Sequence, residues 1–404
     1  MSAIVIGAGI AGCATAYALA QRGIKVTLIE RHAAIAQEAS GNPVAVLYPK
    51  FSAKESIANR LANHGFNFTT QLLQKLPNYG DFFNACGQLQ LAFNGAEIAK
   101  QNKLFNEDYL NKNQWVMRFV DAAEASEIAG IRLTQGGLFL PQAGWVKPAL
   151  FCQALIDSPL ITVNTNCQAL RLAQSANGWR AKYDNGYLEA ENVVICNAND
   201  IKQFGFCNSA AITPVRGQLE FFAANSASKQ LKTIVCSDHF VSPAIDGLHA
   251  LGTTYAPSNL NAEISSADTQ NNLAALGKIS PEINQQINPK TMRSRVAFRS
   301  QTLDYRPLAG HVLDEEKLRK NPPRYNANQA DLPWLQGLYI NAGHGSKGMI
   351  TAPICGEMIA CFIDKNQITK APLPIDAKLA GSLNPSRFLL RELGLKQLAA
   401  LLLI

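Results

Sequence analysis

Three glycines near the start of the chain have the spacing of a phosphate-binding turn. The segment Gly7-Ala8-Gly9-Ile10-Ala11-Gly12 directly follows the apolar stretch 3–6. In such a segment the first glycine permits a tight turn, the second lets the backbone approach a pyrophosphate, and the third lets a helix pack closely on the strand. A helix over roughly residues 10–22 would direct its free N–H groups and its positive dipole end at the phosphates.

An acidic residue stands where a ribose would lie. A second apolar stretch, residues 25–29, ends at Glu30. A carboxylate at the tip of this predicted strand can accept both ribose hydroxyls, and it repels a 2′-phosphate. Strand, turn, helix, strand and acid follow in the required order, so the N-terminal segment predicts an adenine dinucleotide site. NAD and FAD both remain open at this point.

A second glycine loop, Gly343-His344-Gly345-Ser346-Lys347-Gly348-Met349, precedes a predicted helix over residues 350–362. No acid follows it at ribose distance. Backbone N–H groups and the positive end of a helix dipole can instead stabilise a developing anion, such as the N1–C2 edge of a reduced flavin. Lys347 could add its charge there. The loop therefore favours FAD, with a purely structural turn as the alternative.

Length and composition indicate a two-lobed globular protein. The chain has 404 residues, of which 47% are hydrophobic and 17% charged, and single cores usually stop growing below this size. The sequence shows neither a signal peptide nor an apolar stretch long enough for a membrane span. The nine cysteines form no CxxC pair. We expect buried thiols in a reducing cytoplasm, no membrane association and no metal site.

The net charge of +7 is concentrated in two segments. Residues 290–324 hold nine basic and four acidic residues, and residues 365–404 hold six basic and two acidic ones. Basic segments on an otherwise slightly acidic body suggest a polyanionic partner. A solvated surface is the alternative.

The element pattern predicts that the chain crosses between two lobes more than once. Apolar stretches near residues 193–195 and 338–341 return to the first sheet, whereas strand-like segments dominate from residue 213 to about 329. We assign residues 1–80, 141–212 and 335–404 to a discontinuous cofactor-binding domain. Residues 81–140 and 213–334 are assigned to a second, β-rich α+β domain.

Further motifs resemble a known family. Ala39-Ser40-Gly41-Asn42, Pro214-Val215-Arg216-Gly217-Gln218 and the C-terminal glycine loop resemble those of FAD-dependent amine oxidoreductases such as D-amino acid oxidase and glycine oxidase. Three further motifs narrow the resemblance to the FAD module of the MnmC family of bifunctional tRNA-modifying proteins. They are Val46-Leu47-Tyr48-Pro49, Arg299 with Thr302 and Asp304, and Leu383-Asn384-Pro385-Ser386-Arg387. The resemblance covers essentially the whole chain.

The resemblance implies a Rossmann-like α/β FAD-binding domain of the D-amino acid oxidase and glutathione reductase type, joined to a β-rich substrate domain. It also implies noncovalent FAD, since the flavin loop has no cysteine, although His344 keeps covalent attachment open. The implied FAD-binding residues are Gly7, Ala8, Gly9, Ile10, Ala11, Gly12, Glu30, Arg31, Ser40, Gly41, Asn42, Cys167, Gly343, His344, Gly345, Ser346, Lys347, Gly348 and Met349.

The implied substrate is a carboxymethylaminomethyl group on the wobble uridine of tRNA. Hydride would pass from the carboxymethyl carbon to the flavin, and hydrolysis of the imine would release glyoxylate and leave aminomethyluridine. Arg299 and Arg216 are the candidates for binding the substrate carboxylate, with Tyr255 and Lys347 as further catalytic candidates. Tyr48, Tyr255 and Tyr305 could line the pocket or stack on the base. The residues expected to hold tRNA phosphates are Arg293, Arg295, Arg387, Arg391 and Lys396.

Two departures from the family pattern affect these expectations. Bifunctional members carry a methyltransferase domain before the FAD module, and this sequence starts at the first FAD strand, so a separate methyltransferase is a possible partner. Leu303 and Arg306 stand where we expect an arginine and an apolar residue. Two other functions stay open: a small-molecule amine oxidase acting on glycine, sarcosine or a D-amino acid, and a flavin-bearing tRNA-binding subunit without turnover.

Overall fold

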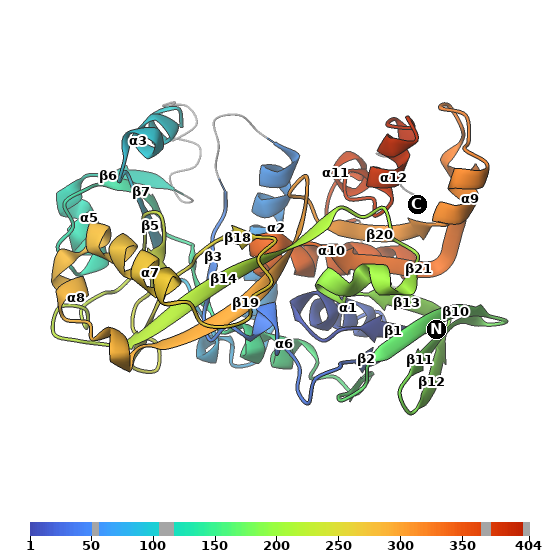
Figure 1. The fold of residues 1–404 in the computed structure, drawn as a ribbon, viewed down its shortest axis with the longest axis horizontal. Coiled ribbons are helices and arrows are strands. Elements are labelled where there is room, and N and C mark those ends of the chain that lie inside the picture. Colours follow the sequence, from blue (N-terminus) through green and yellow to red (C-terminus); the bar gives the residue numbers. More distant parts are fainter. Residues whose placement is uncertain (51–55, 105–116, 365–372, 399–404) are drawn as a thin grey trace.

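The computed structural model describes residues 1–50, 56–104, 117–364 and 373–398. Two β-sheets form the centres of two lobes that lie side by side along the long axis of the molecule (Figure 1). Long strands of the second lobe run back toward the first, and the chain passes between the lobes several times.

A six-stranded sheet forms the first lobe, in the order β20-β21-β13-β1-β2-β9. All neighbours are parallel except β20 and β21, which are antiparallel. The strands are nearly continuous apolar runs because both faces of the sheet are covered. Their bounds are Ser2–Ile6 (β1), Lys25–Ile29 (β2), Ile161–Asn164 (β9), Asn192–Ile195 (β13), Leu308–Leu313 (β20) and Trp334–Ala342 (β21).

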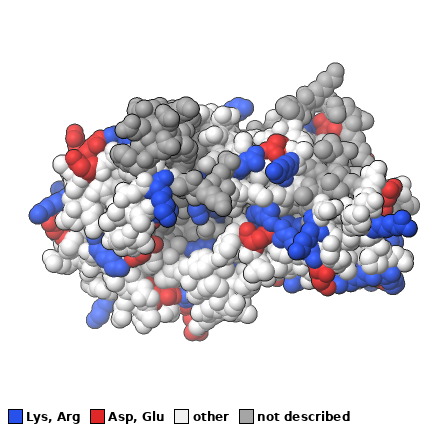
Figure 2. Space-filling model, turned by 90° about the horizontal axis from the view of Figure 1, so that it is seen from above, with Lys and Arg blue, Asp and Glu red and all other residues white. Residues whose placement is uncertain are grey.

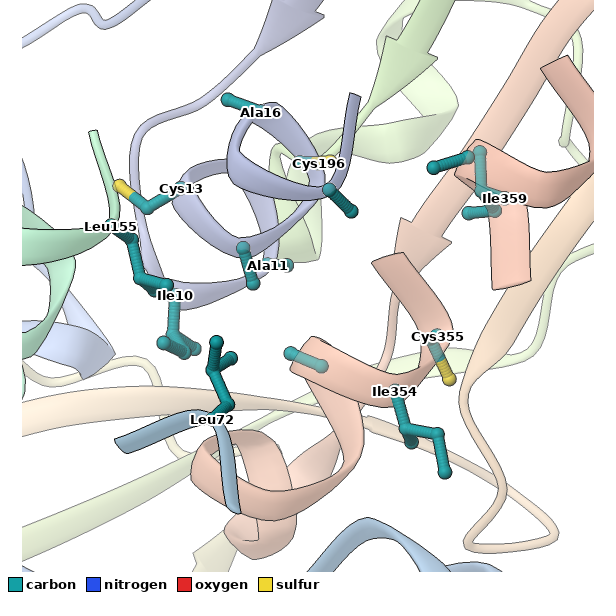
Figure 3. Packing of buried hydrophobic residues seen from close by; sticks show 14 of the residues in the cluster. Ile10, Ala11, Cys13, Ala16, Leu72, Leu155, Cys196, Ile354, Cys355 and Ile359 are labelled. Carbon is teal, nitrogen blue, oxygen red and sulfur yellow. The ribbon is translucent and has the colours of Figure 1, made fainter. Parts of the chain in front are cut away.

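Helices cover one face of this sheet. Ala3 and Val5 of β1 point into a core shared with α1 (Ile10–Ala20), α2 (Ile57–Lys75), α6 (Pro148–Leu155) and α10 (Gly348–Ile363). Figure 3 shows apolar side chains of these helices and the end of β13 converging on the space between α1 and α10. The helices cross closely at Gly356, where a Cβ atom would lie 3.0 Å from the backbone of Thr15. A side chain at Gly356 would therefore push the two helices apart.

A three-stranded meander covers the other face. Ile4 and Ile6, which alternate with Ala3 and Val5 along β1, pack into a second core with Trp179 and Ala181 of β11. The meander consists of β10 (Ala169–Ser175), β11 (Gly178–Tyr183) and β12 (Gly186–Ala190). A parallel sheet between helices and a β-meander confirms the predicted FAD-binding fold class.

The second lobe is built on a nine-stranded sheet in the order β18-β14-β17-β16-β15-β5-β7-β6, with β19 pairing β14. Helices α5, α7 and α8 pack on it through a separate core. The strand bounds are Gln88–Leu91 (β5), Arg118–Val120 (β6), Gly137–Leu140 (β7), Ile212–Ala223 (β14), Ile234–Cys236 (β15), Phe240–Val241 (β16), Leu248–Gly252 (β17), Ala256–Pro257 (β18) and Arg293–Thr302 (β19). The helices are α3 (Gly95–Asn102), α5 (Ala122–Ala129), α7 (Ser266–Ile279) and α8 (Pro281–Gln285).

The remaining elements are short. A small sheet joins β3 (Ala45–Leu47), β8 (Gly144–Val146) and β4 (Phe83–Asn84). Helices α9 (Glu315–Lys320), α11 (Ala377–Gly381) and α12 (Arg387–Glu392) lie beyond β20 at the far end of the first lobe (Figure 1).

One predicted boundary differs from the structure. The sequence division places residues 213–334 in the second lobe, but β20 pairs with β21 in the first sheet, and α9 follows it there. The polypeptide therefore re-enters the first lobe before residue 308. The sequence pattern missed this because β20 has the same strand-like composition as the segments before it.

Within the described residues, one stretch is long and apolar enough to cross a membrane: Gly345–Ile363, which includes α10. From the sequence we expected no stretch of this kind, so this expectation missed Gly345–Ile363. Two thirds of its most apolar window is buried among α1, α2 and the sheet, as expected for a core helix.

Candidate active site

A first cavity lies at the carboxyl ends of β1, β2 and β13. Gly7 and Gly9 form one wall, and Glu30, Ser40 and Cys167 line the remainder with Arg31, His32, Asn197 and Asp200. In parallel sheets this edge is where ligands bind, because loops and helix N-termini converge there. The structure thus brings the predicted residues of the N-terminal motif together with Cys167, which follows β9.

Glu30 is buried at the back of this cavity, with 7% of its surface exposed. Its Oε2 atom accepts a hydrogen bond from the backbone N–H of Ala8 at 2.8 Å, and Oε1 accepts one from the N–H of His32 at 2.9 Å. These bonds fix the carboxylate at the strand tip, where each oxygen keeps a further lone pair for a ligand hydroxyl.

Within the N-terminal glycine motif, a side chain would clash most severely at Gly12, in the first turn of α1. A Cβ atom on Gly12 would lie 1.8 Å from the carbonyl oxygen of Gly7, far inside van der Waals contact. The missing side chain lets α1 start directly against the turn, with its N-terminus open to the cavity. Ser40 approaches from the opposite side and accepts a hydrogen bond from the N–H of Ile10 at 3.0 Å.

The loop that carries Ser40, Gly41 and Asn42 is fastened by Arg295 of β19. The Arg295 guanidinium donates to Asn42 Oδ1 and to the carbonyl oxygens of Gln37 and Glu38. Arg295, predicted to bind tRNA phosphates, instead ties the second lobe to the cofactor loop. Arg31 forms ion pairs with Glu38 and Asp200 at the rim of the first cavity.

A second cavity continues from the first and shares Gly9, Ala39, Ser40, Cys196 and Ala198 with it. It reaches the second glycine loop, where Gly343, His344, Gly345, Ser346, Gly348 and Met349 line it. The N-terminus of α10 opens into this cavity, so that the positive end of its dipole faces any group bound there. From the second lobe, Tyr48, Leu219, Phe240, Thr253, Arg299 and Ser300 complete the wall.

His344 is held on both sides by hydrogen bonds. Its Nε2 atom lies 3.0 Å from Oδ1 of Asn341, and its Nδ1 atom lies 2.9 Å from Oγ1 of Thr351. Burial lowers the pKa of His344 to about 3, so the ring is neutral. Since an amide oxygen only accepts, Nε2 carries the proton and Nδ1 is an acceptor that faces the Thr351 hydroxyl, whose single proton goes either to Nδ1 or to the Lys347 carbonyl at 3.0 Å. Asn341 in turn donates to Thr15 Oγ1 of α1 at 3.0 Å.

Lys347 lies beside the second cavity. Its Nζ atom is buried, has no hydrogen-bond partner among the described residues, and sits 3.3 Å from the ring centre of Tyr48. Burial lowers the pKa of Lys347 to about 7. The amine therefore contacts Tyr48, which lines the cavity, and the neighbours of Lys347, Ser346 and Gly348, also line it.

Arg299 projects from β19 into the second cavity. Its guanidinium donates to Thr253 Oγ1 at 3.1 Å and to the Thr254 carbonyl at 3.3 Å, and the Tyr255 ring lies 5.9 Å away. Burial lowers the pKa of Arg299. Among the described residues no carboxylate lies within ion-pair distance of it. A half-buried cation without a counter-ion, facing a cavity, is suited to bind an anionic ligand.

The structure does not place Arg216 beside Arg299. Arg216 is 2% exposed and forms an ion pair with Asp268, and it donates to the carbonyl oxygens of Asn261 and Glu263. Its donors are already engaged, so its predicted role as a carboxylate ligand is withdrawn. Tyr255 is half exposed at the rim, where its hydroxyl accepts a hydrogen bond from Gln301 at 2.6 Å.

The predicted phosphate-binding residues divide into two groups. Arg293 and Lys396 are exposed, and Arg391 is partly exposed beside Asp304. Arg387 is fully buried, where it pairs with Asp304 and donates to the carbonyl oxygens of Arg306 and Pro307. Arg387 therefore cannot reach a phosphate and serves to hold the turn after β19. Figure 2 shows several lysine and arginine side chains close together near the middle of the face seen from above.

Comparison with known proteins identifies the family. The model of the FAD-dependent oxidoreductase family named DAO matches residues 2–361. The chain belongs to this family. It is 39% identical to the tRNA 5-methylaminomethyl-2-thiouridine biosynthesis bifunctional protein MnmC of Methylobacillus flagellatus over 98% of this chain, and 40% identical to that of Ectopseudomonas mendocina over 97%. The chain spans 60% of the length of both relatives. The predicted resemblance is confirmed.

Solved structures of this FAD-dependent family share the fold. Glycine oxidase from Geobacillus kaustophilus superposes with a TM-score of 0.75 at 20% identity, covering 95% of this chain and 98% of the other. L-Proline dehydrogenase from P. horikoshii gives a TM-score of 0.74 at 19% identity, covering 97% and 98%.

Family membership implies FAD, and the two joined cavities fit it. The first cavity offers Glu30 for a ribose and the α1 N-terminus for the pyrophosphate, and the second offers the α10 N-terminus for the flavin. The lining residues that sequence reasoning missed include Thr253 and Ser300 of the second lobe, and Asn341 at the end of β21. Asn341 is adjacent to the predicted glycine loop, which is the one signal that could have indicated it.

Proposed function

We propose that the chain is an FAD-dependent oxidoreductase of tRNA wobble-uridine modification. It removes the carboxymethyl group of 5-carboxymethylaminomethyl-(2-thio)uridine and yields 5-aminomethyl-(2-thio)uridine and glyoxylate. The relatives are named as tRNA biosynthesis proteins, which supports tRNA as the substrate. The observation that carries the chemistry is Arg299, which faces the second cavity and has no carboxylate partner in the part of the chain that the structure describes.

Each group of the site has a part in this reaction. Arg299, oriented by Thr253, would bind the carboxylate and so hold the carboxymethyl carbon within the second cavity. FAD, when bound, accepts the hydride from that carbon. The N-terminus of α10 and the Lys347 amine favour negative charge at this end of the cavity. Water then adds to the imine carbon, and the carbon–nitrogen bond breaks to release glyoxylate and the primary amine.

The FAD is bound noncovalently in this proposal. Both ring nitrogens of His344 are engaged by Asn341 and Thr351, and attachment through either nitrogen would break that arrangement. Acid precipitation of the holoprotein should leave the flavin in the supernatant. A yellow pellet that keeps its flavin after washing would show a covalent bond.

The partners and location of the protein follow from the substrate. A tRNA-modifying enzyme works in the cytoplasm, and the relatives' additional length leaves room for a methyltransferase activity, here proposed to come from a separate polypeptide or domain. Copurification of a methyltransferase with the tagged protein from its native cells would support this part of the proposal.

Anaerobic flavin bleaching distinguishes the proposal from its alternatives. The holoprotein should lose its absorbance near the flavin maximum when mixed with tRNA that carries 5-carboxymethylaminomethyluridine, and keep it with free sarcosine or glycine. Bleaching by sarcosine but not by the tRNA would assign the protein to the small-molecule amine oxidases. Binding of the tRNA without bleaching would instead indicate a non-catalytic subunit.

A further inference from the structure

The turn after β19 holds two apolar side chains out into solvent. Leu303 is 77% exposed and Tyr305 is 69% exposed. Tyr305 adopts a left-handed backbone conformation with φ of 59°, which costs free energy in a residue other than glycine. Large exposed apolar side chains in a strained turn mark a surface that contacts another molecule.

Ion pairs and hydrogen bonds of Asp304 and Arg387 hold this turn in place. Asp304, between the two exposed residues, pairs with Arg306, Arg387 and Arg391. The Asp304 carboxylate accepts hydrogen bonds from Arg387 and Arg306, and these two arginines lower its pKa well below the usual range. The buried Arg387 also binds the carbonyl oxygens of Arg306 and Pro307. Leu303 and Tyr305 are therefore presented in a fixed position.

The turn adjoins the mouth of the second cavity. Gln301, four residues before Tyr305, bridges to His344 of the flavin loop and donates to the hydroxyl of Tyr255 at the rim. The Tyr305 N–H bonds back to the Thr302 carbonyl at 3.1 Å, so the chain reverses immediately after the strand. Tyr305 is therefore at most about 14 Å along the backbone from Gln301, which follows the lining residue Ser300.

The charge around the turn is positive. Three guanidinium groups surround the single carboxylate of Asp304, which leaves two positive charges uncompensated within the cluster. Arg391 keeps 38% of its side chain exposed. Aromatic side chains beside cations suit single-stranded nucleic acid, because bases stack on the rings and phosphates approach the cations.

We propose that the turn 303–306 is a stacking platform for the anticodon loop. A nucleobase next to the wobble uridine stacks on Tyr305, Leu303 packs against its edge, and Arg391 holds the adjoining phosphate. This inference rests on the proposed function, since it names the contact that keeps the RNA in place while the modified uridine enters the cavity.

The test measures binding and oxidation separately in the FAD-loaded full chain. Affinity is determined for an anticodon stem-loop RNA with an unmodified wobble uridine, at fixed salt, for wild type, Tyr305→Ala and Tyr305→Phe. Tyr187→Ala is the matched control, because Tyr187 is 60% exposed and lies 4.5 Å from the Arg180 guanidinium on the distant meander. Flavin reduction by the free nucleoside 5-carboxymethylaminomethyluridine is recorded for each protein.

Tyr305→Ala should weaken stem-loop binding about fivefold to a hundredfold, the range that loss of one stacked base gives. Tyr305→Phe and Tyr187→Ala should bind like wild type, and all four proteins should be reduced by the nucleoside at the same rate. Unchanged RNA affinity in Tyr305→Ala would overturn the platform and leave the turn as a surface for a protein partner. Failure of the nucleoside and the modified RNA to reduce wild type would instead refute the proposed function itself.

Discussion

The Nε2 atom of His344 lies 3.0 Å from the Oδ1 atom of Asn341, and Asn341 in turn bonds to Thr15 of α1. This chain of hydrogen bonds connects the second glycine loop to the helix that begins at the first. The two ends of the cofactor site are thus held at a fixed separation by buried polar side chains. Each member is satisfied, which is the condition under which such networks stabilise a structure.

Replacing His344 by alanine should loosen the flavin end of the site. The change leaves Oδ1 of Asn341 without its donor, and one unsatisfied buried group costs about 1–3 kcal/mol. We expect a lower melting temperature and weaker FAD binding, measured by thermal unfolding and by titration of the apoprotein with FAD. His64→Ala, at an exposed position on α2, is the control. Equal FAD affinity in the two variants would contradict the network's role.

Arg299→Met should weaken substrate binding by about 30-fold or more, the effect of removing one member of a desolvated charge pair. The FAD spectrum and the thermal stability should be retained, because no carboxylate in the described chain depends on Arg299. The apparent affinity comes from the substrate dependence of anaerobic flavin reduction. Arg180→Met, at an exposed position on the β-meander, should behave like wild type. An unchanged affinity in Arg299→Met would remove this residue from carboxylate binding.

Arg216→Met should lower the stability of the protein and leave its substrate affinity intact, the reverse of Arg299→Met. Breaking the buried pair with Asp268 is expected to cost about 3–5 kcal/mol of unfolding free energy. Substrate affinity of the fraction that folds should stay close to that of wild type. Denaturant unfolding and the same reduction assay separate the two quantities. A stable Arg216→Met protein with poor substrate affinity would restore the original prediction for this residue.

Lys347 should make stability depend on pH. Its pKa is lowered to about 7 in the folded protein from 10.5 in the unfolded chain, so the folded state disfavours the charged amine. The loss of unfolding free energy caused by the buried charge is complete below pH 7, and it is relieved as the pH rises from 7 to 10.5. The stability of Lys347→Met should therefore exceed that of wild type most at pH 6, and the difference should be smaller at pH 9. Melting temperatures at both values, with exposed Lys229→Met as the control, check this. A gain that does not change with pH would contradict it.

The local parts of the site could be predicted from the sequence, because their residues are close along the chain. Gly7 to Gly12 and Glu30 form one strand–turn–helix–strand unit, and each residue acts on its neighbours. Asn341 and Thr15 are 326 positions apart, and only the assembled fold brings them together. Their contact leaves no pattern in either segment.

The register of two strands explains why only Arg299 of the two candidate arginines lines the second cavity. In the β14–β19 pair, Arg299 lies opposite Val215, and Arg216 lies opposite Phe298. Successive side chains on a strand point to opposite faces, so Arg216 projects away from the face that carries Arg299. A slip of β14 by one residue would place both arginines on the same face, and the sequence does not specify this register.

A nucleoside profile of tRNA tests the proposed function most directly. Undermodified tRNA that carries 5-carboxymethylaminomethyl-2-thiouridine is incubated with the FAD-loaded protein and an electron acceptor, digested and analysed by mass spectrometry, and glyoxylate is measured in parallel. We predict conversion to 5-aminomethyl-2-thiouridine with one glyoxylate released per nucleoside, and loss of both products in Arg299→Met. An unchanged nucleoside profile with a fully loaded and reducible flavin would contradict the proposed function.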